Sequence, residues 1–139
     1  KVNPKFKSKK RKEQSSKIKE IQSPNGLKIQ IGGNNRQNEL ISLKQSKKGD
    51  LWFHAQEIPG SHVVLKSSNA LMDDRDMQLA ADLASFFSRA RGSKLVPVIM
   101  VPIENLQRIS GALPGTVRHR GGKVLWGKAE RAQKYFHQK

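Results

Sequence analysis

Asp50, His54, His62 and His119 are the side chains in this sequence whose chemistry suits acid–base catalysis or metal binding. On a strand that rises about 3.3 Å per residue, Asp50 and His54 would share a face but stand about 13 Å apart, too far to ligate one ion. A turn at Pro59-Gly60 could bring His54 and His62 together, and one well-placed imidazole is enough for a general base. Because no third ligand has a recognisable spacing, we expect no metal, no cofactor and no catalysis, with chemistry at His54 or His62 as the alternative.

A second group of chemically distinctive residues lies near the C-terminus and is cationic. The pair Gly121-Gly122 predicts a two-residue turn between strands at residues 116–120 and 123–127. Strand alternation would then give this hairpin one apolar face and one cationic face. We expect the apolar face, turned to a core, to carry Val117, His119, Val124 and Trp126, and the cationic face to carry Arg118, Arg120, Lys123 and Leu125.

The three cations of this hairpin have a clear chemical use. On one face they would repel one another unless a negative group lay opposite them, and arginine offers a planar fork that matches phosphate oxygens. The alternative is a solvated edge strand whose charges discourage aggregation. We favour contact of Arg118, Arg120 and Lys123 with the phosphates of RNA.

The distribution of charge favours the same kind of ligand. The 139 residues hold 27 Lys and Arg and 11 Asp and Glu, which gives a formal net charge of +16. Residues 1–20 carry +7, residues 108–139 carry +7, and the stretch between them carries only +2. A nearly neutral core with two cationic ends is typical of a protein that binds a polyanion, and nucleic acid is the leading candidate. Val2, Phe6 and Ile18 are too few large apolar groups for a membrane-binding face in the N-terminal arm.

The composition also excludes several other classes of protein. Cysteine is absent, which rules out disulfide frameworks, thiolate zinc sites and cysteine nucleophiles. No run approaches the roughly 18 apolar residues of a membrane span, and the basic N-terminus lacks the apolar segment of a secretory signal. We therefore expect a cytoplasmic protein with no membrane partner. Since the sequence begins at Lys1, we expect a piece of a longer polypeptide, with a stand-alone protein as the alternative.

Aromatic and imidazole side chains could add base stacking to phosphate contacts. Trp52 and Phe53 should fill opposite faces of a sheet, and we assign Phe53 to the core. Trp52 shares its face with His54, so this pair could either stack unpaired RNA bases or pack in a core. His62 follows Ser61, whose amide and hydroxyl could meet a phosphate oxygen, although a plain tight turn is the favoured alternative there.

The other polar residues that attract attention have simple structural explanations. Asn34 and Asn38 suit helix capping and turn bonding, and we keep both as lower-ranked RNA contacts. The carboxylate of Asp50 should cap a turn or pair with a nearby cation. Arg89 and Arg91 should stabilise the end of a helix through its dipole.

An α+β domain is predicted to position these residues, with a mixed, mainly antiparallel sheet of about five to seven short strands, one long helix and one short helix. Besides the hairpin, periodicity and turn residues predict strands at residues 27–31, 51–55, 62–66 and 96–103, and helices at residues 35–45 and 73–91. We assign residues 1–22 to a basic, disordered arm, residues 23–127 to the domain, and residues 128–139 to a basic tail.

One segment of the sequence closely resembles the signature of a known family, the NFACT-R domain of the NFACT proteins. The resemblance covers roughly residues 22–127 and rests on motifs in a fixed order. These are residues 33–38 with their asparagines, Asp50-Leu51-Trp52-Phe53-His54-Ala55, Ile58-Pro59-Gly60-Ser61-His62-Val63-Val64-Leu65, the Ala80-Ala81 helix, Ser88-Arg89-Ala90-Arg91 and Pro114-Gly115-Thr116-Val117.

The resemblance implies a non-catalytic, RNA-binding part of a factor in ribosome-associated quality control. NFACT proteins bind the large ribosomal subunit that carries a stalled peptidyl-tRNA, recruit tRNA and promote untemplated tailing of the nascent chain. The resemblance therefore implies ribosomal RNA or tRNA, the large subunit and the other NFACT domains as partners. Two alternatives stay open: an RNA-processing enzyme that uses His54 or His62, and a fibronectin-binding adhesin, which suits an older name of the family.

Overall fold

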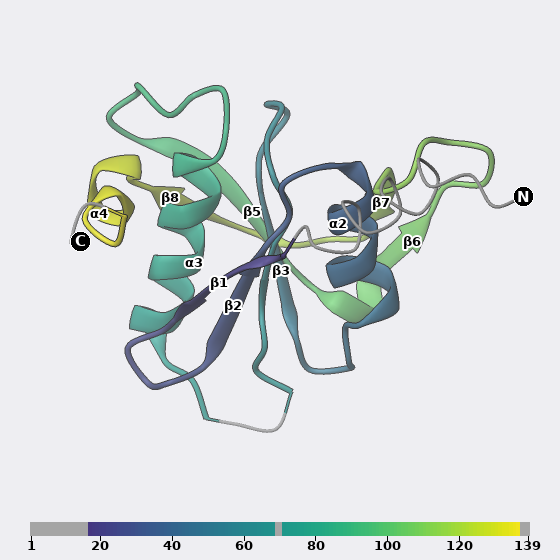
Figure 1. Cartoon of the computed structure of the whole chain (residues 1–139), viewed down its shortest axis with the longest axis horizontal. Helices are drawn as coiled ribbons and strands as arrows, with labels where there is room; N and C mark the ends of the chain where they lie inside the picture. The colour runs from purple at the N-terminus through teal and green to yellow at the C-terminus, as the bar shows by residue number, and fades with distance from the viewer. Residues whose placement is uncertain (1–16, 69–70, 137–139) are drawn as a thin grey trace, which may run out of the picture.

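The computed structural model describes residues 17–68 and 71–136, which form three layers (Figure 1). The middle layer is a six-stranded sheet in the order β1-β2-β4-β3-β5-β8, and every neighbouring pair in it is antiparallel. Its strands are β1 (Lys19–Gln22), β2 (Lys28–Ile31), β3 (Leu51–Ala55), β4 (Val63–Leu65), β5 (Val96–Pro102) and β8 (Lys123–Gly127). The predicted α+β class is confirmed.

The two outer layers cover opposite faces of this sheet (Figure 1). On one side lie α3 (Asp74–Phe86) and α4 (Ala129–Gln133). On the other lie α2 (Asn35–Glu39) with its π-helical continuation η1 (Leu40–Lys44), and a two-stranded ribbon of β6 (Leu106–Arg108) and β7 (Val117–His119). The short 3-10 turn η2 (Ile103–Asn105) connects β5 to this ribbon.

Alternation along β3 divides the interior into two cores. Phe53 is fully buried among apolar side chains of the sheet and α3. Trp52 points to the other face, where it is 4% exposed and packs in a smaller cluster with Ile41, Val64, Ile99, Val101 and Ile103. The expectation that Trp52 and Phe53 fill opposite faces is therefore confirmed, and both are buried.

Helix α3 begins where the sequence predicts but ends earlier. Asp73 is its N-cap, and Asp76 completes a capping box by accepting the backbone N–H of Asp73. The last helical residue is Phe86, so the expectation that Arg89 and Arg91 stabilise the helix end through its dipole is wrong. The chain leaves the helix because it pairs with the turn before β4.

Backbone hydrogen bonds show how that pairing replaces the last helical turn. The amide of Ser61 donates to the carbonyl of Phe87 at 3.1 Å, and the amide of Arg89 donates to the carbonyl of Pro59 at 3.0 Å. The guanidinium of Arg91 lies 4.2 Å from the centre of the Phe86 ring, which gives this arginine a cation–π contact.

The segments assigned to the flanking arm and tail each form one element of the fold, β1 and α4. Residues 19–22 form β1, which pairs with β2 across a turn at residues 23–26. Helix α4 falls within the predicted tail and docks on α3, where the guanidinium of Arg131 donates to the buried carboxylate of Asp82 at 2.8 Å. The rest of the predicted arm, residues 1–16, and residues 137–139 lie outside the described part of the chain.

The predicted hairpin between residues 116–120 and 123–127 is wrong. Strand β7 pairs with β6 in the ribbon, whereas β8 pairs with β5 at the edge of the main sheet. Gly122, with φ of 124°, makes the crossing between the two sheets, and a Cβ there would lie 2.8 Å from Cδ1 of Ile99. Two glycines permit a sharp change of direction, and this one serves a crossover rather than a two-residue turn.

Close contact between β8 and α3 makes Gly127 a strict requirement. A Cβ at this position would lie 2.5 Å from the carbonyl oxygen of Ala81 and 2.9 Å from Cβ of Ser85. We expect Gly127→Ala to lower the free energy of unfolding by about 2 kcal/mol, because the strand or the helix must move. Urea denaturation monitored by circular dichroism measures this loss.

Gly92 provides the matched control for this substitution. It follows the end of the helix in an exposed loop, and no heavy atom lies within 4 Å of a Cβ built on it. Gly92→Ala should leave the unfolding midpoint unchanged within error. Equal stability of the Gly127 and Gly92 variants would contradict the close packing of β8 on α3.

Candidate nucleic-acid interface

A cleft of about 430 Å³ opens between β3, the chain before β4 and the β6–β7 ribbon. Its walls carry Trp52 and the three imidazoles that the sequence singled out. Trp52 stacks on His54 at 5.6 Å between ring centres, meets His62 edge to face at 5.2 Å, and lies 5.9 Å from His119. The expected approach of His54 to His62 is confirmed, with ring centres 5.6 Å apart. The remaining lining residues are Ala55, Gln56, Glu57, Ile99, Gly115, Thr116 and Val117.

His62 forms the deep wall of this cleft and is held by two residues of the α2–η1 layer. Its Nδ1 lies 2.8 Å from Oγ of Ser42, and its backbone amide donates to Oδ1 of Asn38 at 3.2 Å. The residue is 6% exposed. Burial, followed by the nearby charge of His54, lowers the pKa of His62 from 6.5 to about 3. His62 is therefore neutral at physiological pH.

This burial predicts a loss of stability in mild acid. The unfolded chain takes up the proton near pH 6.5, whereas the folded protein excludes it until about pH 3. The contribution of His62 is therefore fully present above pH 6.5 and is lost as the pH falls from 6.5 towards 3. Between pH 7 and pH 5 this one residue should cost about 2 kcal/mol of unfolding free energy.

Chemical denaturation at the two pH values, compared with His62→Gln, tests the prediction. The variant should lose less stability than the unaltered protein on going from pH 7 to pH 5, with a difference of about 2 kcal/mol. The starting stability of the variant does not enter the comparison, because only the change with pH is compared. Equal pH dependence of the two proteins would show that His62 accepts its proton in the folded state.

The other two imidazoles of the cleft have a defined tautomer when neutral. Nδ1 of His54 lies 2.6 Å from the carbonyl oxygen of Ala55, and Nδ1 of His119 lies 3.0 Å from that of Gly121. A carbonyl can only accept, so Nδ1 carries the proton in both rings. Nε2 is then left as a hydrogen-bond acceptor in each neutral ring.

The two asparagines of the signature hold the layer that backs the cleft. The side chain of Asn34 is the N-cap of α2 and accepts the amide of Gln37 at 2.9 Å. Asn38 is buried and accepts the amide of His62. The capping role is confirmed for Asn34, whereas Asn38 instead makes a long-range bond to His62. Contact of either side chain with RNA stays a prediction.

Ser61 and Asp50 also have structural partners. The amide of Ser61 already donates to Phe87, which leaves its hydroxyl as the group that could meet a phosphate. Asp50 is fully buried and accepts the amides of Lys47 at 2.9 Å and Ser68 at 3.1 Å. Its carboxylate also pairs with Nζ of Lys66 at 2.8 Å. Both expected uses of Asp50, as a cap and as an ion-pair partner, are confirmed.

The candidate phosphate contacts do not share one hairpin face. Arg118 lies on β7, Arg120 follows that strand, and Lys123 is the first residue of β8 in the other sheet. All three side chains are exposed, and none forms an ion pair with a carboxylate in residues 17–68 or 71–136. They lie in residues 118–123, where the chain passes from the ribbon to the main sheet, and we call this segment the ribbon-to-sheet crossing.

Trp126 and Val124 are the residues of this surface that sequence reasoning assigned wrongly. They were expected in a core, but Trp126 is 56% exposed and Val124 is 41% exposed. The register places Ile99 opposite both His54 and Val124, so these side chains share one face of the sheet. The ribbon and α2–η1 cover only part of that face. Alternation grouped Val124 with Trp126 correctly, but the inward face of β8 is the other one. Leu125, expected on the cationic face, is partly buried against the core beside α3, and Gly127 is buried on the same face.

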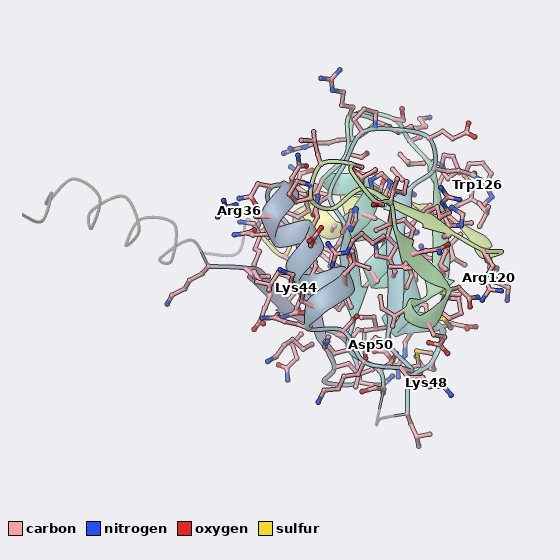
Figure 2. The ribbon with its side chains drawn as sticks, turned by 90° about the vertical axis from the view of Figure 1, so that its right-hand side faces the viewer. Arg36, Lys44, Lys48, Asp50, Arg120 and Trp126 are labelled. Carbon is pink, nitrogen blue, oxygen red and sulfur yellow. The ribbon has the colours of Figure 1, made fainter. Side chains whose placement is uncertain are left out.

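Cations flank this face on both sides. Figure 2 shows Arg120 and Trp126 along one side, and Arg36 and Lys44 on α2–η1 along the other. Glu39, between them in sequence, accepts the amide of Gly115 and pairs with Arg108, and these bonds hold its pKa below its usual range. The one carboxylate of α2 is thus neutralised by the ribbon, which leaves the flank basic.

A comparison with protein families matches residues 17–121 to the NFACT protein RNA binding domain. This chain belongs to that family. The match contains the whole cleft, the ribbon and five of the six strands of the main sheet. The resemblance carried by the Asp50–Ala55 and Ile58–Leu65 motifs is confirmed.

Curated relatives of this NFACT RNA-binding domain carry the name Rqc2 homolog RqcH. The chain is 47% identical over 97 residues to the Rqc2 homolog RqcH of Streptococcus suis, which covers 70% of this chain and 17% of that protein. It is 39% identical over 111 residues to the Rqc2 homolog RqcH of Bacillus subtilis, which covers 80% of this chain and 19% of that protein. The chain therefore spans less than a fifth of these relatives.

A solved structure shares the fold. It is the C-terminal part of the fibronectin/fibrinogen-binding protein from Streptococcus suis, with a TM-score of 0.79 and 41% sequence identity, over 86% of this chain and 49% of that one. In the described part of the NFACT RNA-binding domain, no group of three or more His, Asp or Glu side chains is placed to hold a metal ion. Nor does that part include a helix of the length and hydrophobicity needed to cross a bilayer.

Proposed function

We propose that this chain is the non-catalytic, RNA-binding module of a factor that acts in ribosome-associated quality control. It would hold a large ribosomal subunit that carries a stalled peptidyl-tRNA, through ribosomal RNA, tRNA or both. The observation that carries the proposal is the combination of the family with its surface: three exposed cations beside an exposed tryptophan and an imidazole cleft. Cations supply affinity for phosphates, and aromatic rings hold unpaired bases.

Several contacts argue that the imidazoles serve binding rather than catalysis. His62 is neutral, buried and bonded to Ser42, so it has no access to a substrate proton. His54 donates its Nδ1 proton to a carbonyl of its own strand and keeps Nε2 as an acceptor, so it is the residue that decides between binding and catalysis. RNA breakdown that survives purification and disappears in His54→Ala would support the enzyme instead.

The alternative of protein adhesion comes from the name of the Streptococcus suis structure. Binding of one preparation of the chain to immobilised fibronectin and to an immobilised RNA, measured side by side, would separate the two functions. A surface of cations and exposed aromatic rings should prefer the RNA by at least a factor of ten at physiological salt. Preference for fibronectin would overturn the proposal.

The decisive experiment uses purified ribosomal subunits. The chain should co-sediment with large subunits that carry peptidyl-tRNA in the presence of excess unrelated RNA, and should stay behind with small subunits. Crosslinking followed by sequencing of the attached RNA would identify ribosomal RNA or tRNA as the ligand. Equal recovery on both subunits would reduce the function to general attraction between a basic protein and RNA.

A further inference from the structure

We propose that the cleft between β3 and the β6–β7 ribbon receives a single unpaired nucleobase and selects one with an exocyclic amino group. This inference rests on the proposed RNA-binding function and extends it to the ligand of one site. A volume of about 430 Å³ is within the range of small-molecule sites. The rings of His54 and His119 offer π-faces at its accessible wall, since both side chains are more exposed than Trp52 and His62 behind them.

The charge of the lining argues that a base enters the cleft and that the phosphate stays outside. Among residues 17–68 and 71–136, no lysine or arginine lines the cleft, and the one carboxylic acid that does is Glu57. A carboxylate repels phosphate, but it accepts hydrogen bonds from amino groups. The cations that suit phosphate, Arg118 and Arg120, lie next to His119 on the outer side of this wall.

The hydrogen-bonding groups of the cleft point to an amino group in particular. Nε2 of His54 and Nε2 of His119 are acceptors in the neutral rings, because Nδ1 donates to a carbonyl in each. Glu57 adds carboxylate acceptors. An exocyclic amino group brings two N–H donors, whereas uracil brings one donor between two carbonyl acceptors. Adenine, cytosine and guanine, which all carry such a group, therefore satisfy this wall better than uracil.

The backbone at Glu57 is consistent with a functional position. Its φ is 55°, and it is the one residue other than glycine with positive φ among residues 17–68 and 71–136. A side chain in this region costs free energy that a glycine would avoid. Glutamate at such a place fits a role for its carboxylate, and it also provides a variant, Glu57→Gly, that folds at least as readily.

Three oligonucleotides of equal length test the inference with the chain as it exists. They are oligoadenylate, the same chain built from purine riboside, which lacks only the amino group, and a fully abasic ribose-phosphate chain. Oligoadenylate should bind about tenfold more tightly than the abasic chain, because the base stacks in the cleft. It should bind about fivefold more tightly than the purine chain, because of the amino group.

The two tryptophans give a local readout by nitrogen–proton correlation spectroscopy. The indole N–H of Trp52 is buried without a hydrogen-bond partner in the described chain, and Trp126 lies outside the cleft. Trp126→Phe assigns the two signals. Oligoadenylate should shift the Trp52 signal, and the abasic chain should leave it in place.

Variants of the rim complete the test. Thr116→Phe should fill the cleft, and it should bring the affinity for oligoadenylate down to that for the abasic chain. Glu57→Gly should reduce the preference for oligoadenylate over the purine riboside chain. Gln107→Ala, on the ribbon face shared with Arg118, is the matched control and should change none of these values.

Two outcomes would overturn the inference, and they are distinguishable. If all three chains bind equally and the Trp52 signal stays in place, the cleft takes no base, while RNA binding through phosphates stands. If none of the chains binds even in dilute buffer, the proposed function fails and the inference fails with it.

Discussion

Replacing Arg118, Arg120 and Lys123 together with glutamate should weaken binding of the chain to tRNA or ribosomal RNA by at least a hundredfold. Each of these exposed cations can release condensed counterions when it meets a phosphate, and each glutamate adds repulsion in its place. Fluorescence anisotropy with a labelled RNA at several salt concentrations measures the effect. The slope of log affinity against log salt should become shallower by about 2 to 3.

A second triple variant separates local contact from net charge. Arg89, Lys94 and Lys134 are also exposed, and they lie in the α3–β5 connection and at the end of α4. Their replacement by glutamate removes the same six units from the formal net charge of +16. This variant should retain most of the affinity. Equal losses in both variants would mean that the overall charge governs binding and that the ribbon-to-sheet crossing has no special part.

Asp50→Ala should cost about 3 to 5 kcal/mol of unfolding free energy, the largest stability effect that we expect from one substitution. Its carboxylate is fully buried, and removal leaves the ammonium of Lys66 and the amides of Lys47 and Ser68 without their partner. Urea denaturation measures the loss. Any fall in RNA affinity should disappear when the comparison is restricted to the folded fraction.

Glu20→Ala is the control for the loss of an acidic group. Glu20 lies 3.8 Å from Lys28 across β1 and β2, with side chains 41% and 59% exposed, and it also accepts Nε2 of Gln30 at 3.0 Å. A pair of this kind contributes between zero and about 1 kcal/mol, so its loss should be small. A change below 1 kcal/mol in Asp50→Ala would show that solvent replaces the lost partners, contrary to the burial of this residue.

The parts of the fold that the sequence predicted well are those whose signals are local. Strand β3 has the predicted bounds, since alternation and flanking turns both act within a few residues. The start of α3 was predicted by the aspartates that cap it. Its end was not, because the pairing of Ser61 and Arg89 with distant carbonyls replaces the last turn.

The candidate site shows the same division between local and long-range information. The approach of His54 to His62 follows from one turn, and the sequence revealed it. The contact of His119 with Trp52 depends on the ribbon, in which β7 pairs with β6. The sequence pattern did not predict a strand at residues 106–108. The exposure of Trp126 depends on where that ribbon stops covering the sheet. Alternation within one segment predicts neither the His119–Trp52 contact nor the exposure of Trp126, because both depend on segments far away in the sequence.

The path of the ribbon has a practical consequence. The chain leaves β5 through η2, forms β6 and β7, and re-enters the main sheet at β8, which pairs with the same β5. Residues 110–113 at its far end are all exposed, and a Cβ on Gly111 would meet nothing within 4 Å. Since the six-stranded sheet does not pass through this loop, a fluorophore or a short affinity tag inserted there should leave the main sheet in place. Such an insertion gives a reporter that follows the domain onto its ligand.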